Sequence, residues 1–222
     1  MDINKLMVSD TSKTHHRIKI LDRISFECQT NEITSIFGAN GSGKSTLFKI
    51  ILGLIKPDEG KLIINGEKID YQNIIKSKNI GYLPQNSFLP KNLKVSKIVR
   101  SCFKDCESQD KVFYEPLINI IEKKNVGALS FGELRYFEFV LLCNMEHKFL
   151  LLDEPFSMVD PKVVELIKEK LLLLKTIKAI VLTDHHYYDV LDISDKNFVI
   201  KNTKVISIEN HADLITYDYL RQ

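Results

Sequence analysis

Short apolar runs separated by polar turns recur along this chain. Apolar and polar residues alternate over Ile18 to Phe26, and a mainly apolar run follows at Ile33 to Phe37. Three further runs, Ile80 to Leu83, Phe149 to Leu152 and Ala179 to Leu182, are equally short. Each of the five predicts a β-strand. Because the apolar strands alternate with helical patterns, we expect an α/β fold whose parallel sheet is covered on both faces.

Helical spacing of apolar residues marks the segments between these runs. After residue 46 apolar side chains recur up to Leu54, with Gly53 suited to end the helix, and Pro161 to Lys175 predicts an amphipathic helix. A short strand is expected at Leu62 to Ile64. From about residue 86 to residue 147 the pattern is mainly helical but irregular, which predicts an inserted helical part.

The segment GANGSGKST lies between an expected strand and an expected helix and matches the pattern G-x-x-x-x-G-K-[ST]. In such a loop the backbone N–H groups turn inward around a phosphate chain, the lysine reaches the terminal phosphates, and the serine can ligate Mg²⁺. The sequence therefore predicts nucleotide binding rather than a structural glycine turn. The candidate residues are Gly38, Ala39, Asn40, Gly41, Ser42, Gly43, Lys44, Ser45 and Thr46.

Two adjacent carboxylates, Asp153 and Glu154, end the apolar run in FLLLDEP. Ligands of open α/β sheets bind at the carboxyl edge of the strands, so both carboxylates are expected at the nucleotide site. There Asp153 would hold Mg²⁺ through water, and Glu154 could polarise a water for attack on the γ-phosphate. On its own this segment would be interpreted as a strand followed by an acidic turn.

Three single residues become informative beside those two motifs. Gln85, in GYLPQ, follows an expected strand, and its amide could reach both the metal and the attacking water. His185, in LTDHH, follows the last apolar strand and could contact the γ-phosphate, while Asp160, in SMVDP, comes just after the acidic pair. Each one alone is more often a surface or capping residue.

Together with the stretch LSFGE at residues 129–133, these pieces occur in the order found in ATP-binding cassette (ABC) ATPases, which the sequence resembles over nearly all of its 222 residues. The matches are GANGSGKST as Walker A, Gln85 as the Q-loop, LSFGE as the signature, FLLLDEP as Walker B, SMVD as the D-loop and His185 as the switch histidine. The resemblance implies a single P-loop ATPase domain over residues 1–222. Its core, with an N-terminal antiparallel β subdomain, would comprise residues 1–85 and 148–222, and its helical subdomain would comprise residues 86–147.

ATP and Mg²⁺ are the ligands that the resemblance implies. Glu154, His185 and Gln85 would be catalytic, and Ser45, Gln85 and Asp153 would hold the metal. In this family the signature binds the γ-phosphate held by the Walker A loop of a second subunit, which implies a homodimer or a heterodimer with another ABC ATPase. That role falls here on residues of the signature and the D-loop, namely Ser130, Gly132, Glu133 and Asp160.

The chain departs from the family pattern at two places. Phe131 stands where the signature normally has a glycine, and a bulky side chain can hinder the approach of the backbone to phosphate. Three interpretations are open: a tolerated variation, a weakened site in a heterodimer, or a helix cap without a phosphate role. The second departure is the lack of an aromatic residue before Phe26 to stack on adenine. His15 or His16 could stack there, or both could be solvated loop residues.

Charge and composition narrow the range of partners. With 31 basic and 29 acidic residues the formal net charge is +2, so no nucleic-acid partner is expected. The four cysteines are scattered and are expected to be reduced thiols. Neither a secretory signal nor an apolar run of the ~18 residues needed by a membrane helix is visible. The resemblance then implies a cytoplasmic protein held at the inner face of the cell membrane by a membrane subunit.

The sequences of the motifs, such as GYLPQ and LLDEPF, are similar to those in the ATPase subunits of lipopolysaccharide export and of branched-chain amino acid transport. Phe88 and Leu89 could line a groove for the membrane subunit or could belong to the core. Leu141 replaces an arginine common in the signature helix of the family. The alternatives are an ABC ATPase outside transport, or a weakly hydrolysing regulatory half of a heterodimer. Phosphate-loop kinases and GTPases are a further class, but membership of that class would not explain LSFGE before the acidic strand.

Overall fold

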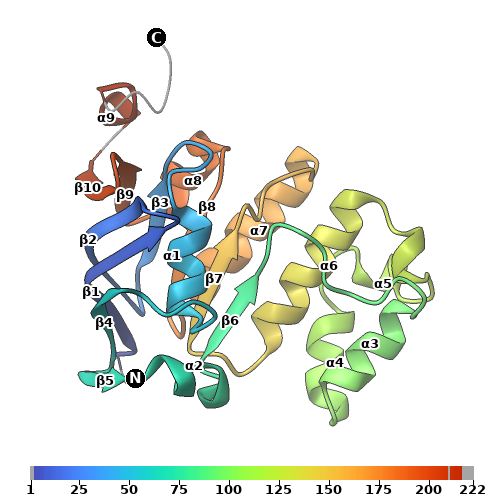
Figure 1. The fold of residues 1–222 in the computed structure, drawn as a ribbon. Coiled ribbons are helices and arrows are strands. Elements are labelled where there is room, and N and C mark those ends of the chain that lie inside the picture. Colours follow the sequence, from blue (N-terminus) through green and yellow to red (C-terminus); the bar gives the residue numbers. More distant parts are fainter. Residues whose placement is uncertain (1–2, 210, 217–222) are drawn as a thin grey trace.

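A six-stranded sheet forms the centre of the molecule, which this computed structural model describes over residues 3–209 and 211–216 (Figure 1). The strand order is β10-β9-β3-β8-β7-β6, and neighbouring strands are parallel except for the antiparallel pair β9 and β10. The strands are β3 (Ile33–Phe37), β6 (Ile80–Leu83), β7 (Phe149–Asp153), β8 (Ala179–Thr183), β9 (Lys196–Lys201) and β10 (Lys204–Ile208). The predicted parallel sheet is confirmed.

Both faces of this sheet are buried, which explains why its strands are apolar at successive positions. In β7 the side chains of Leu150 and Leu152 pack into one hydrophobic cluster, with helices α6 (Phe131–Asn144), α7 (Pro161–Leu174) and α8 (Tyr187–Ile193). Those of Phe149 and Leu151 point to the other face and pack with helix α1 (Lys44–Ile51). This helix ends at Ile51, and Gly53, the residue expected to end it, follows two positions later with a left-handed φ of 74°. Leu54, which shares the helical spacing in the sequence, lies beyond the helix and is exposed.

A second sheet, entirely antiparallel, covers α1 from the outside (Figure 1). Its order is β2-β1-β4-β5, with β1 (Lys5–His15), β2 (Ile18–Gln29), β4 (Glu59–Ile64) and β5 (Glu67–Ile69). Strand β1 was not predicted from its pattern. Its pairing with β2 shifts register between Val8 and Thr11, where Asp10 has a left-handed φ of 49° and interrupts the alternation.

Helices fill the part of the chain between β6 and β7, as predicted. They are α3 (Val95–Cys102), α4 (Cys106–Phe113), α5 (Ile118–Ile121), the short 3₁₀ turn Val126–Ala128 and α6 (Phe131–Asn144). Every residue of α6 from Arg135 to Cys143 is buried, so this helix is apolar on nearly all sides. Leu141 belongs to this core, where an arginine would need its own partners.

The remaining helices are α2 (Tyr71–Ser77), α7 (Pro161–Leu174), α8 (Tyr187–Ile193) and α9 (His211–Thr216). Helix α7 begins at Pro161, where Asp160 caps it, and ends one residue before the predicted end. Within the described ranges, no helix combines the length and apolar character needed to cross a membrane. Strands β3, β6, β7 and β8 run in parallel, so the segments that follow them meet at one edge of the sheet.

Candidate functional site

The loop between β3 and α1 surrounds the ammonium group of Lys44. Its Nζ donates to the carbonyl oxygen of Gly38 and, over 3.3 Å, to that of Ala39. Burial lowers the pKa of Lys44, while the nearby carboxylates of Glu154 and Asp153 oppose that shift. The side-chain oxygen of Ser42 is buried and has no hydrogen-bond partner in the described structure. The loop thus presents a buried cation and an unpaired hydroxyl, both suited to phosphate oxygens.

Asp153 ends β7 and is held by the neighbouring strands on both sides. Its Oδ1 accepts a hydrogen bond from Thr183 Oγ1 at 2.8 Å, and its Oδ2 accepts one from the hydroxyl of Tyr82 at 3.2 Å. Burial, followed by the charge of Asp153, raises the pKa of Tyr82, so this hydroxyl stays a proton donor. The orientation of the carboxylate is therefore fixed by its neighbours.

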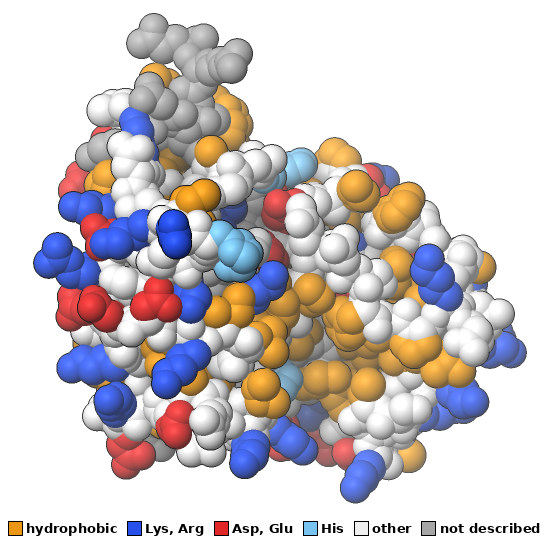
Figure 2. Space-filling model, viewed as in Figure 1, with side chains coloured by type: hydrophobic (Ala, Val, Ile, Leu, Met, Phe, Trp, Pro, Cys, Tyr) orange, Lys and Arg blue, Asp and Glu red, His pale blue; other side chains and the backbone are white. Residues whose placement is uncertain are grey.

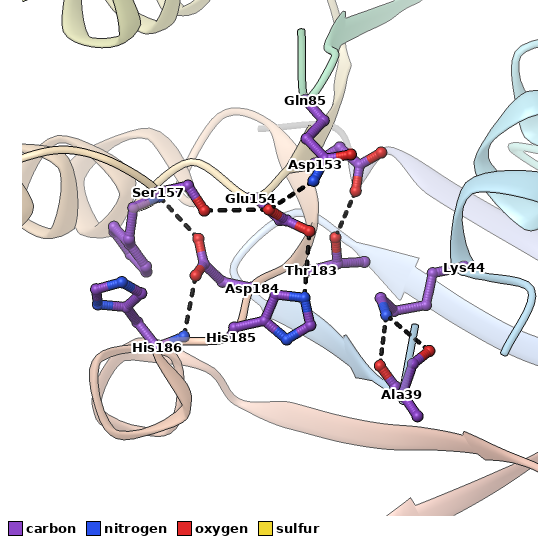
Figure 3. Close-up of polar contacts among 12 residues, drawn as sticks. Ala39, Lys44, Gln85, Asp153, Glu154, Ser157, Thr183, Asp184, His185 and His186 are labelled. Atoms are coloured by element: carbon purple, nitrogen blue, oxygen red, sulfur yellow. Dashed lines mark hydrogen bonds and ion pairs between the residues drawn. The ribbon is translucent and has the colours of Figure 1, made fainter. Parts of the chain in front are cut away.

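Glu154, one residue further on, has a strained backbone and a carboxylate with three polar contacts (Figure 3). Its φ of 57° is left-handed, and its N–H donates to the carbonyl of Thr183 at 2.7 Å. The carboxylate accepts from Gln85 Nε2 at 2.9 Å and from Ser157 Oγ at 3.1 Å, and His185 Nε2 lies 3.3 Å away. The three side chains expected to be catalytic thus lie together.

Gln85, Asp153 and Glu154 line a common cleft of about 420 Å³ with the loop. Its lining comprises Ile20, the loop residues Asn40, Gly41, Ser42, Gly43, Lys44, Ser45 and Thr46, and then Gln85, Asp153 and Glu154. A hydroxyl, an amide oxygen and a carboxylate from Ser45, Gln85 and Asp153 are the kinds of oxygen ligand that Mg²⁺ accepts beside waters and phosphates. The donor set present therefore fits this metal.

Four residues predicted to act from the signature and the D-loop do not line that cleft. Ser130 caps α6, its Oγ accepting from the N–H of Glu133 at 3.2 Å while its own N–H donates to Glu133 Oε2 at 2.9 Å. Ser130, Gly132, Glu133 and Asp160 line a separate pocket of about 300 Å³. The side chain of Asp160 accepts from the N–H groups of Lys162 and Val163. None of the four lines the Walker A cleft of its own chain.

Phe131 is 75% exposed and stands at the first position of α6. The next residue, Gly132, packs closely on the D-loop, since a Cβ placed on it would lie 3.3 Å from the carbonyl oxygen of Met158. Met158 is also exposed and has a left-handed φ of 60°. Two apolar side chains therefore project from the signature and the D-loop.

Four residues had roles that the sequence left open, namely His15, His16, Phe88 and Leu89. His15 and His16 are at the turn between β1 and β2, with ring centroids 4.2 Å apart, and are not among the residues that line the nucleotide cleft. Phe88 is exposed, whereas Leu89 packs against the main hydrophobic cluster. Phe88 is therefore the more accessible of this pair.

Three contributors to the site were missed by the sequence analysis. Tyr82 and Thr183 hold Asp153, and Arg135 of α6 donates to backbone carbonyls of both acidic residues. A signal for Arg135 was present, since it and Glu138 are charged residues three positions apart in an otherwise apolar stretch. Tyr82 and Thr183 had no such signal, because both residue types are ordinary in strands.

A phosphate loop after a parallel strand, with an acidic pair opposite it, defines a nucleoside triphosphatase of the P-loop class. Residues 21–157 match the sequence pattern of the ABC transporter family, and the chain belongs to that family. It is an ABC transporter ATP-binding subunit, and ATP hydrolysis is the activity of the family.

The chain is similar to the lipopolysaccharide export system ATP-binding protein LptB of Haemophilus influenzae, with 31% identity over 91% of this chain and 89% of that protein. It is also 30% identical to the sulfate/thiosulfate import ATP-binding protein CysA of Mesostigma viride, over 94% of this chain and 63% of that protein. A solved ATP-binding subunit of an ABC transporter superposes with a TM-score of 0.83 at 23% identity, covering 97% of this chain and 94% of that one. The predicted fold of the ABC type is confirmed.

Proposed function

We propose that this chain is the ATP-hydrolysing motor subunit of an ABC transporter and drives a separate membrane subunit. The observation that supports it best is that Gln85 and His185 both contact the carboxylate of Glu154, which lines one cleft with the Walker A loop. ATP would lie with its phosphates on the backbone N–H groups of the loop and on Lys44. Residues 1–222 would act as one ATPase domain, with core residues 1–85 and 148–222 and helical residues 86–147.

Hydrolysis in this proposal is carried by the carboxylate of Glu154, which accepts a hydrogen bond from the attacking water. Gln85 and His185 contact that carboxylate and are placed to orient the water and the γ-phosphate. Mg²⁺, held by Ser45, Asp153 and Gln85, would neutralise charge on the phosphates. The strained backbone of Glu154 supports a functional role, since such strain concentrates at active sites.

Dimerisation on ATP is the second part of the proposal. Ser130, Gly132, Glu133 and Asp160 line a different pocket from their own Walker A loop, and they would complete the site of a second subunit. The partner is either a second copy or another ABC ATPase. The capping box at Ser130 leaves its hydroxyl hydrogen free to reach phosphate, so helix capping and phosphate binding are compatible.

An apolar groove supports docking of the membrane subunit. A pocket of about 280 Å³ lies between α1, α2 and β6 and is lined mainly by apolar side chains, which are Leu52, Leu54, Ile74, Ile75, Ile80 and Tyr82. Figure 2 shows hydrophobic side chains gathered on this face, between the sheet region and the helices of the inserted part. Leu54 and Ile75 are exposed, and an apolar helix of a membrane protein would cover both.

The ring of Tyr82 lines this groove while its hydroxyl holds Asp153, so docking and the nucleotide site share one side chain.

The relatives differ in direction of transport, one being named for export of lipopolysaccharide and the other for import of sulfate/thiosulfate. We infer export of lipopolysaccharide or a similar cargo, because the relative named for export is the more similar of the two. The subunit would sit at the cytoplasmic face of the membrane, with no role in nucleic-acid binding at a net charge of +2.

The test for a membrane partner is capture from solubilised membranes with Leu54→Asp and Ile75→Asp variants. Both should lose a captured membrane protein and keep ATP binding, because their side chains lie in the groove and outside the nucleotide cleft. Leu173→Asp is the matched control, since Leu173 is an exposed apolar residue on α7. Capture of soluble proteins alone by the unaltered chain would instead favour an ABC ATPase outside transport, or a regulatory half of a heterodimer.

A further inference from the structure

Arg135 is a buried cation on the second turn of α6, with 7% of its surface exposed. Its Nη1 donates to the carbonyl oxygen of Pro84 at 2.6 Å, directly before Gln85. Its Nη2 donates to the carbonyl of Asp153 and, at 3.0 Å, to that of Glu154. One guanidinium group therefore joins the signature helix to the ends of β6 and β7.

Glu138 continues this connection one turn further along α6. It is 1% exposed, and its Oε1 accepts from Ser87 Oγ at 2.6 Å and from the N–H of Phe88 at 3.1 Å. Its Oε2 lies 3.9 Å from Arg135 Nη1. The Q-loop is thus held to α6 on both sides of Gln85, before it by Arg135 and after it by Glu138.

The side chains held in this way are those that meet at the carboxylate of Glu154. Gln85 Nε2 donates to Glu154 Oε2, and both residues have their adjoining backbone bonded to the same helix. Any tilt of α6 relative to the sheet would move the backbone at Pro84 and the backbone at Asp153 and Glu154 in the same direction. Because Phe131 and the signature lie at the N-terminus of this helix, the proposed contact with a second subunit would bear on its orientation.

We propose that Arg135 and Glu138 are positioning residues that tie the orientation of the signature helix to the Gln85–Glu154 contact. They do not touch substrate. They fix the positions of the general base Glu154 and of the Gln85 amide. A change in the orientation of α6 would therefore shift the backbone beside both residues and alter the rate of hydrolysis. This inference rests on the proposed role of Glu154 and on the proposed contact of the signature with a second subunit, and it does not depend on a membrane partner.

Stability alone is a weak explanation for these two residues. Buried charged pairs are often no more stabilising than apolar residues of similar volume, because their desolvation offsets their attraction. The two charged groups are separated by 3.9 Å, and most of their hydrogen bonds go to backbone atoms beside catalytic residues. Unlike an isolated ion pair, the two side chains connect α6 to the Q-loop and to the end of β7.

The test compares Arg135→Lys, Glu138→Gln and Glu138→Ala with Lys178→Met. Lysine at 135 keeps the charge, but its single ammonium nitrogen cannot occupy both of the positions from which Nη1 and Nη2 donate. Glutamine at 138 keeps an acceptor for Ser87 and Phe88, whereas alanine removes it. Lys178 is the matched control, since it is also 7% exposed and donates to the carbonyls of Met145 and His147 at the far end of α6.

Kinetics give the first measurement. Arg135→Lys and Glu138→Ala should lower kcat about tenfold or more, because displacement of catalytic groups by a fraction of an ångström is costly. Their KM for ATP should stay unchanged, as the loop that binds phosphate is not contacted. Glu138→Gln should retain most of the rate. Lys178→Met should lower the melting temperature and leave kcat per folded molecule unchanged.

Amide hydrogen exchange of the purified chain gives a second measurement that needs no turnover. Arg135→Lys should speed exchange in both residues 85–88 and residues 153–157, and Lys178→Met should speed it only near residues 145–149. The proposal is overturned if Arg135→Lys leaves kcat unchanged, if KM rises in proportion to the loss of rate, or if exchange increases at only one of the two segments.

Discussion

Gly43 and Gly41 belong to the same phosphate-binding loop, and replacing each by alanine separates two physical effects. Both have left-handed φ angles, 110° at Gly43 and 81° at Gly41, so either substitution strains the backbone. A Cβ at Gly43 would lie 2.8 Å from Leu21 Cδ2 and 3.3 Å from the carbonyl oxygen of Ile20, whereas nothing lies within 4 Å of a Cβ at Gly41. Only Gly43→Ala therefore adds overpacking against β2.

The magnitudes follow from these contacts. Backbone strain costs about 1–3 kcal/mol in either variant. Overpacking adds about 1–3 kcal/mol to Gly43→Ala alone. In a protein of this size each kcal/mol lowers the melting temperature by about 2–4 °C, so Gly43→Ala should melt several degrees below Gly41→Ala.

Thermal unfolding followed by circular dichroism measures the difference, with ATP affinity measured in parallel. Gly43→Ala should also bind ATP more weakly than Gly41→Ala, because moving residue 43 away from β2 shifts a backbone N–H that faces phosphate. Equal melting temperatures for the two variants would refute the claim that the loop is packed tightly against β2.

Three further predictions concern the signature and the acidic strand. The ion pair with Lys124 holds the pKa of Glu133 below its usual range, so its stabilisation is present above the unfolded pKa and is lost as the pH falls through the folded one. Urea unfolding should therefore show Glu133→Gln to be less stable by about 0.5 kcal/mol at neutral pH and equal to the unaltered chain in acid. Tyr82→Phe keeps the ring but leaves Asp153 less well oriented, so the Mg²⁺ concentration needed for half-maximal binding of a fluorescent ATP analogue should rise about tenfold. Phe131→Gly removes an exposed side chain and should cost about 1 kcal/mol of stability while raising ATPase turnover; an unchanged rate in a confirmed homodimer would show that the phenylalanine is tolerated.

Patterns of local sequence predicted the central sheet because its strands are buried on both faces. The runs at Phe149 to Leu152 and Ala179 to Leu182 are apolar at every position, and both form strands where expected. Strand β1 escaped prediction because Asp10 and the shifts of register after Val8 break its alternation. Its position depends on pairing with β2 and β4, which no local pattern contains.

At the site, the motifs placed Gln85, Glu154 and His185 correctly at one edge of the sheet, because parallel strands end together. The residues that hold them were not foreseen. Arg135 bonds to backbone carbonyls 51 and 18–19 positions away, and such contacts depend on how α6 packs on the sheet. Ser130 illustrates the reverse case, since its capping box with Glu133 is local and is readable from LSFGE itself.

Steady-state ATP hydrolysis by the purified chain, beside its Glu154→Gln variant and with oligomeric state followed in ATP, tests the central claim most directly. Glutamine keeps the shape of the side chain but cannot act as a general base, so turnover should disappear while a dimer with bound ATP accumulates. Undiminished turnover by Glu154→Gln would contradict the assignment of Glu154 as the general base.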